Sequence, residues 1–108
     1  MAITPGRIEI NTTLQLKITF RDQDDVLTNP TTVKFKTRTP AGTETTYTYG
    51  TDAEVEREST GLYLASVVPD EAGRWFFRWE TTGPVYTTAG NFIVQYSPFY
   101  DDIDVGYA

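Results

Sequence analysis

The chain has 108 residues, with 9 Lys and Arg against 15 Asp and Glu and therefore a net charge of −6. A chain of this length forms one domain, which can bury about two thirds of its surface without disulfide bonds. Proteins that bind nucleic acids use clustered Lys and Arg to neutralise the phosphate backbone, so the excess of acidic residues disfavours general nucleic-acid binding. Cys and His are both absent. This excludes thiol nucleophiles, His-based triads, disulfides and the usual Cys/His zinc sites.

The sequence shows no run of ~18 apolar residues, so it predicts neither a transmembrane helix nor a membrane partner. The N-terminus has neither the basic nor the apolar region of a signal peptide, so we expect none in this sequence. We expect residues 1–6 to form an N-terminal arm. The lack of Cys is compatible with a reducing compartment without establishing one.

Threonine accounts for 19 residues, and 7 Tyr, 6 Phe and 2 Trp accompany it. β-branched and aromatic side chains suit a pleated, half-buried surface and are poor helix formers. The composition therefore predicts an all-β fold.

Alternation of apolar and polar residues marks the strands, and turn signals separate them at short spacing. In chain order the predicted strands lie at 14–21, from 33 to a turn at 39–42, at 43–49, near 54–58, and at 62–68, 74–80 and 85–96. Gly90 predicts a bulge or a break in the last of them. The spacing is typical of a single immunoglobulin-like antiparallel β-sandwich of seven to eight strands, which we expect to occupy residues 7–96.

The outward face of the strand at 74–80 is the first candidate interface. With the core face assigned to Trp75, Phe77 and Trp79, Phe76 points outward between Arg74 and Arg78. Aromatic side chains beside Arg are enriched at protein interfaces, so these outward residues are candidate contact residues. Packing of Phe76 under the Arg stems, or pairing of Arg78 with a Glu across strands, would explain the same pattern without a partner.

The segment 97–108 is the second candidate, because it breaks the periodicity of the sandwich. It carries the apolar anchors Phe99, Tyr100, Ile103, Val105 and Tyr107, which are separated by the acids Asp101, Asp102 and Asp104. Such a peptide can dock by strand addition or into a groove, and its acids favour a basic partner. We therefore predict an extended C-terminal docking tail, with an unpartnered tail as the alternative.

Three other patterns suggest chemistry that the sequence does not support. The acidic loop at 22–25 lacks the spacing of a calcium-binding EF-hand, which favours a solvated loop. The Glu residues at 54–58 alternate on one strand face, where no cleft for a catalytic acid pair is indicated. Trp75 and Trp79 could stack a sugar, but aromatics that alternate with polar residues usually belong to the core. We predict no catalytic residue, no metal site and no cofactor.

The segment 60–75 resembles the E–F corner of immunoglobulin-like domains, with Asp70, Gly73 and Trp75 in the pattern. In that family a Tyr hydroxyl bonds to backbone upstream of the corner. Trp75 takes its place here, and an indole N–H can act only as a donor. Phe77 stands where antibody-type domains have the second Cys of their disulfide, which argues against that subclass.

A narrower resemblance covers residues 12–96. Its motifs are Pro30-Thr31-Thr32-Val33-x-Phe35, then Pro40-x-Gly42-x-x-Thr45-x-Tyr47-x-Tyr49-Gly50, then Gly61-x-Tyr63, then Ala72-Gly73-x-Trp75-x-x-Arg78-Trp79-Glu80. The pattern resembles small proteins encoded among the head and connector genes of tailed bacteriophages, which are structural or accessory proteins of the virion.

This resemblance implies a non-enzymatic virion protein, first of all an auxiliary (decoration) protein bound to the capsid through surface contacts and its tail. The implied partners are the major capsid protein or a neighbouring virion protein, together with sister subunits, and neither nucleic acid nor membrane. The protein would assemble in the host cytoplasm and reside in the virion. Two alternatives stay open: a neck or tail component at the head–tail junction, and an immunoglobulin-like module that binds glycans or cell surfaces.

Overall fold

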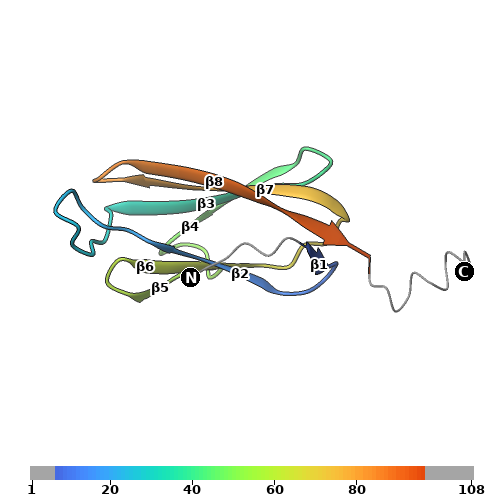
Figure 1. Ribbon diagram of the computed structural model, residues 1–108, viewed down its shortest axis with the longest axis horizontal. Helices are drawn as coiled ribbons and strands as arrows, with labels where there is room; N and C mark the ends of the chain where they lie inside the picture. The colour runs from blue at the N-terminus through green and yellow to red at the C-terminus, as the bar shows by residue number, and fades with distance from the viewer. Residues whose placement is uncertain (1–6, 97–108) are drawn as a thin grey trace, which may run out of the picture.

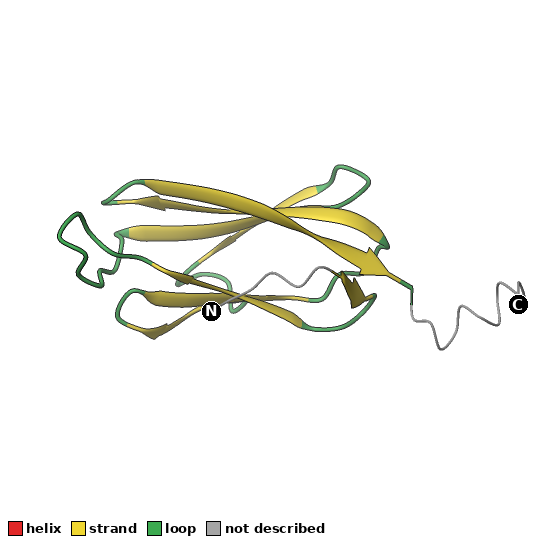
Figure 2. Ribbon diagram, in the orientation of Figure 1, coloured by secondary structure: helices red, strands yellow, loops and turns green. Residues whose placement is uncertain are grey.

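The computed structural model describes residues 7–96, which form eight β-strands in two layers (Figure 1). The strands are β1 (Arg7–Glu9), β2 (Leu14–Thr19), β3 (Thr32–Arg38), β4 (Glu44–Thr48), β5 (Val55–Ser59), β6 (Leu62–Val67), β7 (Gly73–Thr82) and β8 (Tyr86–Gln95). One sheet has the order β1-β8-β7-β3-β4 and the other β2-β6-β5. Figure 2 shows that this part of the chain consists of strands and loops, so it includes no helix that could cross a membrane. The predicted all-β sandwich is confirmed.

The first strand is the element that the sequence did not reveal. β1 has three residues, too few to show alternation, and it pairs in parallel with the end of β8 from Ile93 to Gln95. The other strand pairs are antiparallel. The remaining strands match their predicted positions to within a few residues at each end.

The prediction of a bulge or break at Gly90 is wrong. β7 and β8 pair without interruption from Gly73–Val94 to Thr81–Tyr86. Gly90 lies opposite Phe77, and a Cβ at position 90 would come within 2.6 Å of the Phe77 Cζ atom. The glycine is needed because the aromatic ring of the neighbouring strand packs on its backbone.

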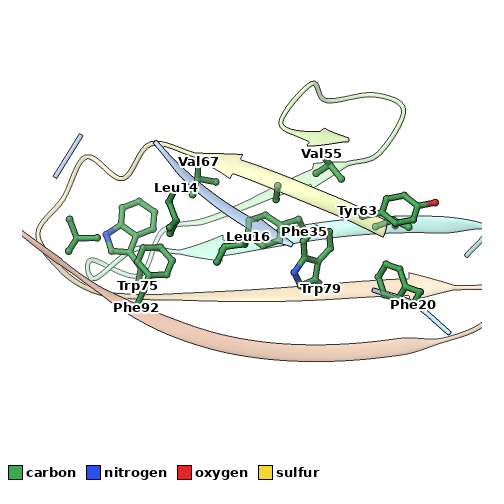
Figure 3. Close-up of a cluster of buried hydrophobic side chains, with 13 residues drawn as sticks. Leu14, Leu16, Phe20, Phe35, Val55, Tyr63, Val67, Trp75, Trp79 and Phe92 are labelled. Atoms are coloured by element: carbon green, nitrogen blue, oxygen red, sulfur yellow. The ribbon is translucent and has the colours of Figure 1, made fainter. Parts of the chain in front are cut away.

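The core lies between the two sheets and is rich in aromatic side chains (Figure 3). At its centre Phe35 is fully buried against Trp79, with ring centroids 4.8 Å apart. Towards one end Trp75 stacks on Phe92, with centroids 6.0 Å apart. Trp75 is 6% exposed and Trp79 2%, while Phe77 is half-buried and packs against the same cluster. The predicted inward face of the strand at 74–80 is therefore the core face.

The turn before β7 is held by Trp75, which occupies the position of the corner Tyr in the immunoglobulin-like pattern. Trp75 donates its indole N–H to the Glu71 carbonyl oxygen at 2.9 Å. The indole thus makes the upstream backbone contact that a Tyr hydroxyl makes at this corner in immunoglobulin-like domains. The contact fixes the start of β7, and with it the strand that carries Phe76.

Tyr47 on β4 gives the fold a dependence on alkaline pH. Its ring packs against Phe35, and burial raises its pKa above the ordinary 10.0, with further raising by the negative charges of Glu54, Asp52 and Asp70. The pKa of Tyr47 is higher in the folded state than in the unfolded state. The stabilising effect of the protonated Tyr47 is therefore complete below the unfolded-state pKa and is lost as pH rises through the folded-state pKa. We expect Tyr47→Phe to unfold at higher pH than the wild type in an alkaline titration followed by circular dichroism. Coincident titration curves would contradict this role.

Candidate functional site

The outer face of the five-stranded sheet carries most of the positive charge of the protein. Side chains alternate along a strand, so every second residue of β3 and β7 points away from the core. The charged and aromatic residues that point outward are Lys34, Lys36 and Arg38 on β3, and Arg74, Phe76, Arg78 and Glu80 on β7. They include five of the 9 Lys and Arg. With Glu80, and with Glu44 of β4 opposite Arg38, the face has a net charge of +3, which leaves −9 on the rest of the chain.

Glu80 neutralises part of this face. Lys36 and Arg78 lie directly opposite each other on β3 and β7, an arrangement of like charges that is destabilising by itself. The Glu80 carboxylate contacts both, at 3.4 Å from Lys36 Nζ and 2.8 Å from Arg78 Nε. The sequence suggested that Arg78 pairs with a Glu across strands; Arg78 pairs instead with Glu80 of its own strand, and the cross-strand ion pair of Glu80 is with Lys36.

Phe76 lies at the centre of the charged face and is 43% exposed. The Arg38 guanidinium sits 5.7 Å from the centre of its ring, within the range of a cation–π contact. Arg74 donates to the side-chain oxygen of Asn91 at 2.7 Å. Among residues 7–96, neither Arg38 nor Arg74 has an ion-pair partner. The structure thus places Arg74, Phe76 and Arg78 on one exposed surface, as the alternation predicted.

A hollow of about 440 Å³ opens beside Phe76. The lining includes Phe77 and Ala89 together with the outward residues Lys36, Arg38, Glu44, Phe76, Arg78 and Glu80. Guanidinium and ammonium groups donate charge-assisted hydrogen bonds to carboxylates, and an aromatic wall accepts apolar or planar groups. The arrangement can therefore bind an acidic segment that also carries apolar side chains. We define these hollow-lining residues, together with Lys34 and Arg74, as the basic face.

Sequence reasoning missed Lys36, Arg38 and Glu44 as parts of this site. The outward direction of Lys36 and Arg38 follows from alternation with the buried Phe35 and Thr37. Their position next to Phe76 follows only from the register in which β3 pairs with β7 and β4. The pairing of β3 with β7 joins residues about forty positions apart in the chain, which no local pattern encodes.

A second group of exposed apolar side chains lies in the loops. Val26 and Leu27 belong to the loop between β2 and β3, and Val85, which is 73% exposed, belongs to the turn between β7 and β8. The Tyr86 hydroxyl donates to the Arg21 carbonyl oxygen, so the two loops meet at one end of the sandwich. Sequence analysis did not single out these residues.

The acidic patterns have structural explanations. The Asp22 carboxylate accepts the backbone N–H groups of Asp24 and Val26 at 2.8 and 3.0 Å, and Asp25 pairs with Arg21 at 3.8 Å. Within residues 7–96, no cluster of three or more metal-ligating side chains is present. The loop at 22–25 is thus organised by its own hydrogen bonds.

The remaining candidates are placed as follows. Glu54, Glu56 and Glu58 are exposed, and Glu58 pairs with Lys17 on β2 at 3.5 Å. Trp75 and Trp79 are buried, so their rings are not open to a sugar. The arm at 1–6 and the tail at 97–108, with Phe99, Tyr100, Ile103, Val105 and Tyr107, lie outside the described residues.

Neither a protein-family model nor a curated protein matches the chain. Solved structures do match. A Lin-41 filamin domain aligns with a TM-score of 0.68 and 12% identity, over 85% of each chain. A Bacteroides vulgatus ATCC 8482 protein assigned as a glycoside hydrolase aligns with a TM-score of 0.61 and 14% identity. The chitinase ChiW from Paenibacillus sp. str. FPU-7 aligns with a TM-score of 0.58 and 23% identity.

The extent of these alignments differs between the filamin domain and the two enzymes. The alignments cover 86% and 77% of this chain, but only 17% and 7% of the glycoside hydrolase and the chitinase. The chain therefore corresponds to a small part of each enzyme and to nearly a whole filamin domain. At these identities the likeness shows the fold: the chain is an immunoglobulin-like β-sandwich.

Proposed function

We propose that this protein is a non-enzymatic interaction module that binds an acidic protein surface through the basic face. The observation that carries the proposal is the concentration of a net +3 charge around an exposed Phe76, on a chain whose other residues sum to −9. Arg and aromatic side chains at the centre of a patch are the usual energetic anchors of protein interfaces. The overall negative charge opposes a long polyanion such as nucleic acid, which would extend beyond the face.

The setting that we propose is the virion of a tailed phage, with the protein as an auxiliary component bound to the capsid. The motifs between residues 30 and 80 support this setting, through their resemblance to phage head and connector proteins. A rigid sandwich with one binding face suits a symmetric lattice, where many weak contacts act together. The small share of the two enzymes that the chain matches supports an accessory role over a catalytic one.

Quantitative mass spectrometry of purified particles tests this setting. A copy number that is a large fraction of that of the major capsid protein would support decoration of the head. A few copies per particle would favour the neck or tail component instead, because symmetry fixes low copy numbers at the head–tail junction. Absence of the chain from particles would contradict the virion setting and favour the binding of glycans or cell surfaces.

Phe76→Ala tests the face itself. The side chain is 43% exposed, so its truncation should reduce the free energy of unfolding by less than about 1 kcal/mol. Loss of a central aromatic anchor should weaken binding to purified particles by about tenfold or more in a co-sedimentation assay. The matched control is Val85→Ala, which shortens an exposed apolar side chain in the turn between β7 and β8. Equal binding by Phe76→Ala and Val85→Ala would contradict the proposed contact.

A further inference from the structure

We propose that the chain's own segment 97–108 docks on the basic face and competes there with the partner surface. This inference rests on the proposed function of the face as a binding site for acidic protein. It assigns the first occupant of that site to the molecule itself.

The chemistry of the segment matches that of the face. The segment carries Asp101, Asp102 and Asp104 with no Lys or Arg, a charge of −3 against the net +3 of the face. The segment combines these acids with apolar side chains, which suits a hollow lined by both Phe76 and Arg groups. Arg38 and Arg74 have no carboxylate partner among residues 7–96, so each can donate hydrogen bonds to a carboxylate of the segment.

The distance along the fold permits docking within one molecule. Val94 pairs with Gly73, so the chain leaves β8 beside the start of β7. Phe76 pairs with Asn91, four residues back from the last residue of β8, or about 13 Å at the rise of a strand. Twelve extended residues span up to about 40 Å, so the segment can turn back and reach the hollow. A link this short gives an effective concentration of about 1 mM or more, which favours the molecule's own segment over that of a second copy.

The other layer of the sandwich is a poor site for the same segment. Its outer face carries Glu56 and Glu58 on β5, and the Glu58 carboxylate already takes Lys17. Like charges there oppose an acidic peptide, whereas the basic face attracts it. Charge thus selects one of the two sheet faces.

A spin label on the segment tests the docking in the full chain. The chain has no Cys, so Gly106→Cys provides a single site for a nitroxide. We expect the amide resonances of Arg38, Phe76 and Arg78 to lose more than half of their intensity when the label is paramagnetic. The loss should be unchanged on dilution and should largely disappear in ~0.5 M NaCl, because salt screens surface charges. The amides of Glu56 and Glu58 on the opposite layer serve as the internal control.

Two outcomes would overturn the inference. The first is full intensity of the basic-face amides in the labelled chain at low salt. The second concerns a mixture of two chains, one with the isotope label and no nitroxide, the other with the nitroxide and no isotope label. Attenuation of the isotope-labelled chain in this mixture would show that the segment docks on a second copy. The variant D101N/D102N/D104N should restore the intensities, whereas E54Q/E56Q/E58Q, which removes the same number of charges from residues 54–58, should leave them reduced.

Binding to purified particles separates this inference from the proposed function. If both hold, D101N/D102N/D104N binds particles severalfold more tightly than the wild type, because the competitor is weakened. If only the proposed function holds, particle binding depends on Phe76 while the spin label leaves the face unaffected. If only the docking holds, the label attenuates the face, yet neither the wild type nor D101N/D102N/D104N binds particles.

Discussion

Replacing Trp79 with Ala is expected to lower the free energy of unfolding by about 3–5 kcal/mol, which is the range for truncating a buried aromatic side chain. Trp79 is 2% exposed and lies directly opposite Phe35 in the pairing of β7 with β3. Its ring also meets the edge of Phe20, which comes from the end of the other sheet. One side chain thus joins the two layers, and its loss leaves a cavity that the strands cannot close without losing register.

Urea unfolding followed by circular dichroism measures this loss. Domains of this size are stable by roughly 5–15 kcal/mol, so a loss of about 3–5 kcal/mol removes about a fifth of the stability or more. The matched control is Val85→Ala, whose exposed side chain should change the stability by no more than about 0.5 kcal/mol. A loss below about 1 kcal/mol for Trp79→Ala would mean that the centre of the core lies elsewhere.

Reversing two charges of the basic face, Arg38→Glu with Arg78→Glu, is expected to weaken binding to purified particles by about 100-fold, equivalent to about 2.7 kcal/mol. The double substitution changes the charge of the face from +3 to −1. Arg38 also loses its contact with the Phe76 ring, while Lys36 keeps its ion pair with Glu80. Both Arg side chains are exposed, so the fold should persist.

The control for this experiment carries the same change of net charge on the other layer. Lys17→Glu with Arg57→Glu replaces two exposed cations of β2 and β5. Co-sedimentation and urea unfolding of both double variants separate a local contact from an effect of overall charge. Equal weakening by the two variants would show that net charge, and not the basic face, controls binding.

The direction of a side chain was predictable wherever a strand alternates over several residues. Trp75 and Trp79 point into the core as predicted, because their phase of the strand is aromatic while the other phase carries the charged residues. Gly90 shows the limit of this reasoning. A glycine in a strand is equally compatible with a bulge and with an aromatic ring packed on its backbone, and the choice depends on Phe77 across the ladder.

The candidate site was predictable only in part, for a related reason. The sequence identifies the outward group on β7, because Arg74, Phe76 and Arg78 follow one another within a single strand. The cation that contacts Phe76 is Arg38, which reaches it through sheet pairing. The charge that defines the basic face is therefore a product of topology: two strands with modest positive charge become one strongly basic surface when they pair.

When the basic face is unoccupied, the uneven distribution of charge among residues 7–96 makes this part of the molecule an electric dipole, with its positive end at the paired strands β3 and β7. Close to a negative surface, such a dipole experiences a torque that turns this end towards the surface before any atoms touch. The effect extends over about one Debye length, or ~10 Å at 0.1 M salt. A protein with the same composition but evenly mixed charges would be repelled in every orientation. Here repulsion of the acidic side and attraction of the basic side act together, so the collisions that succeed are already aligned.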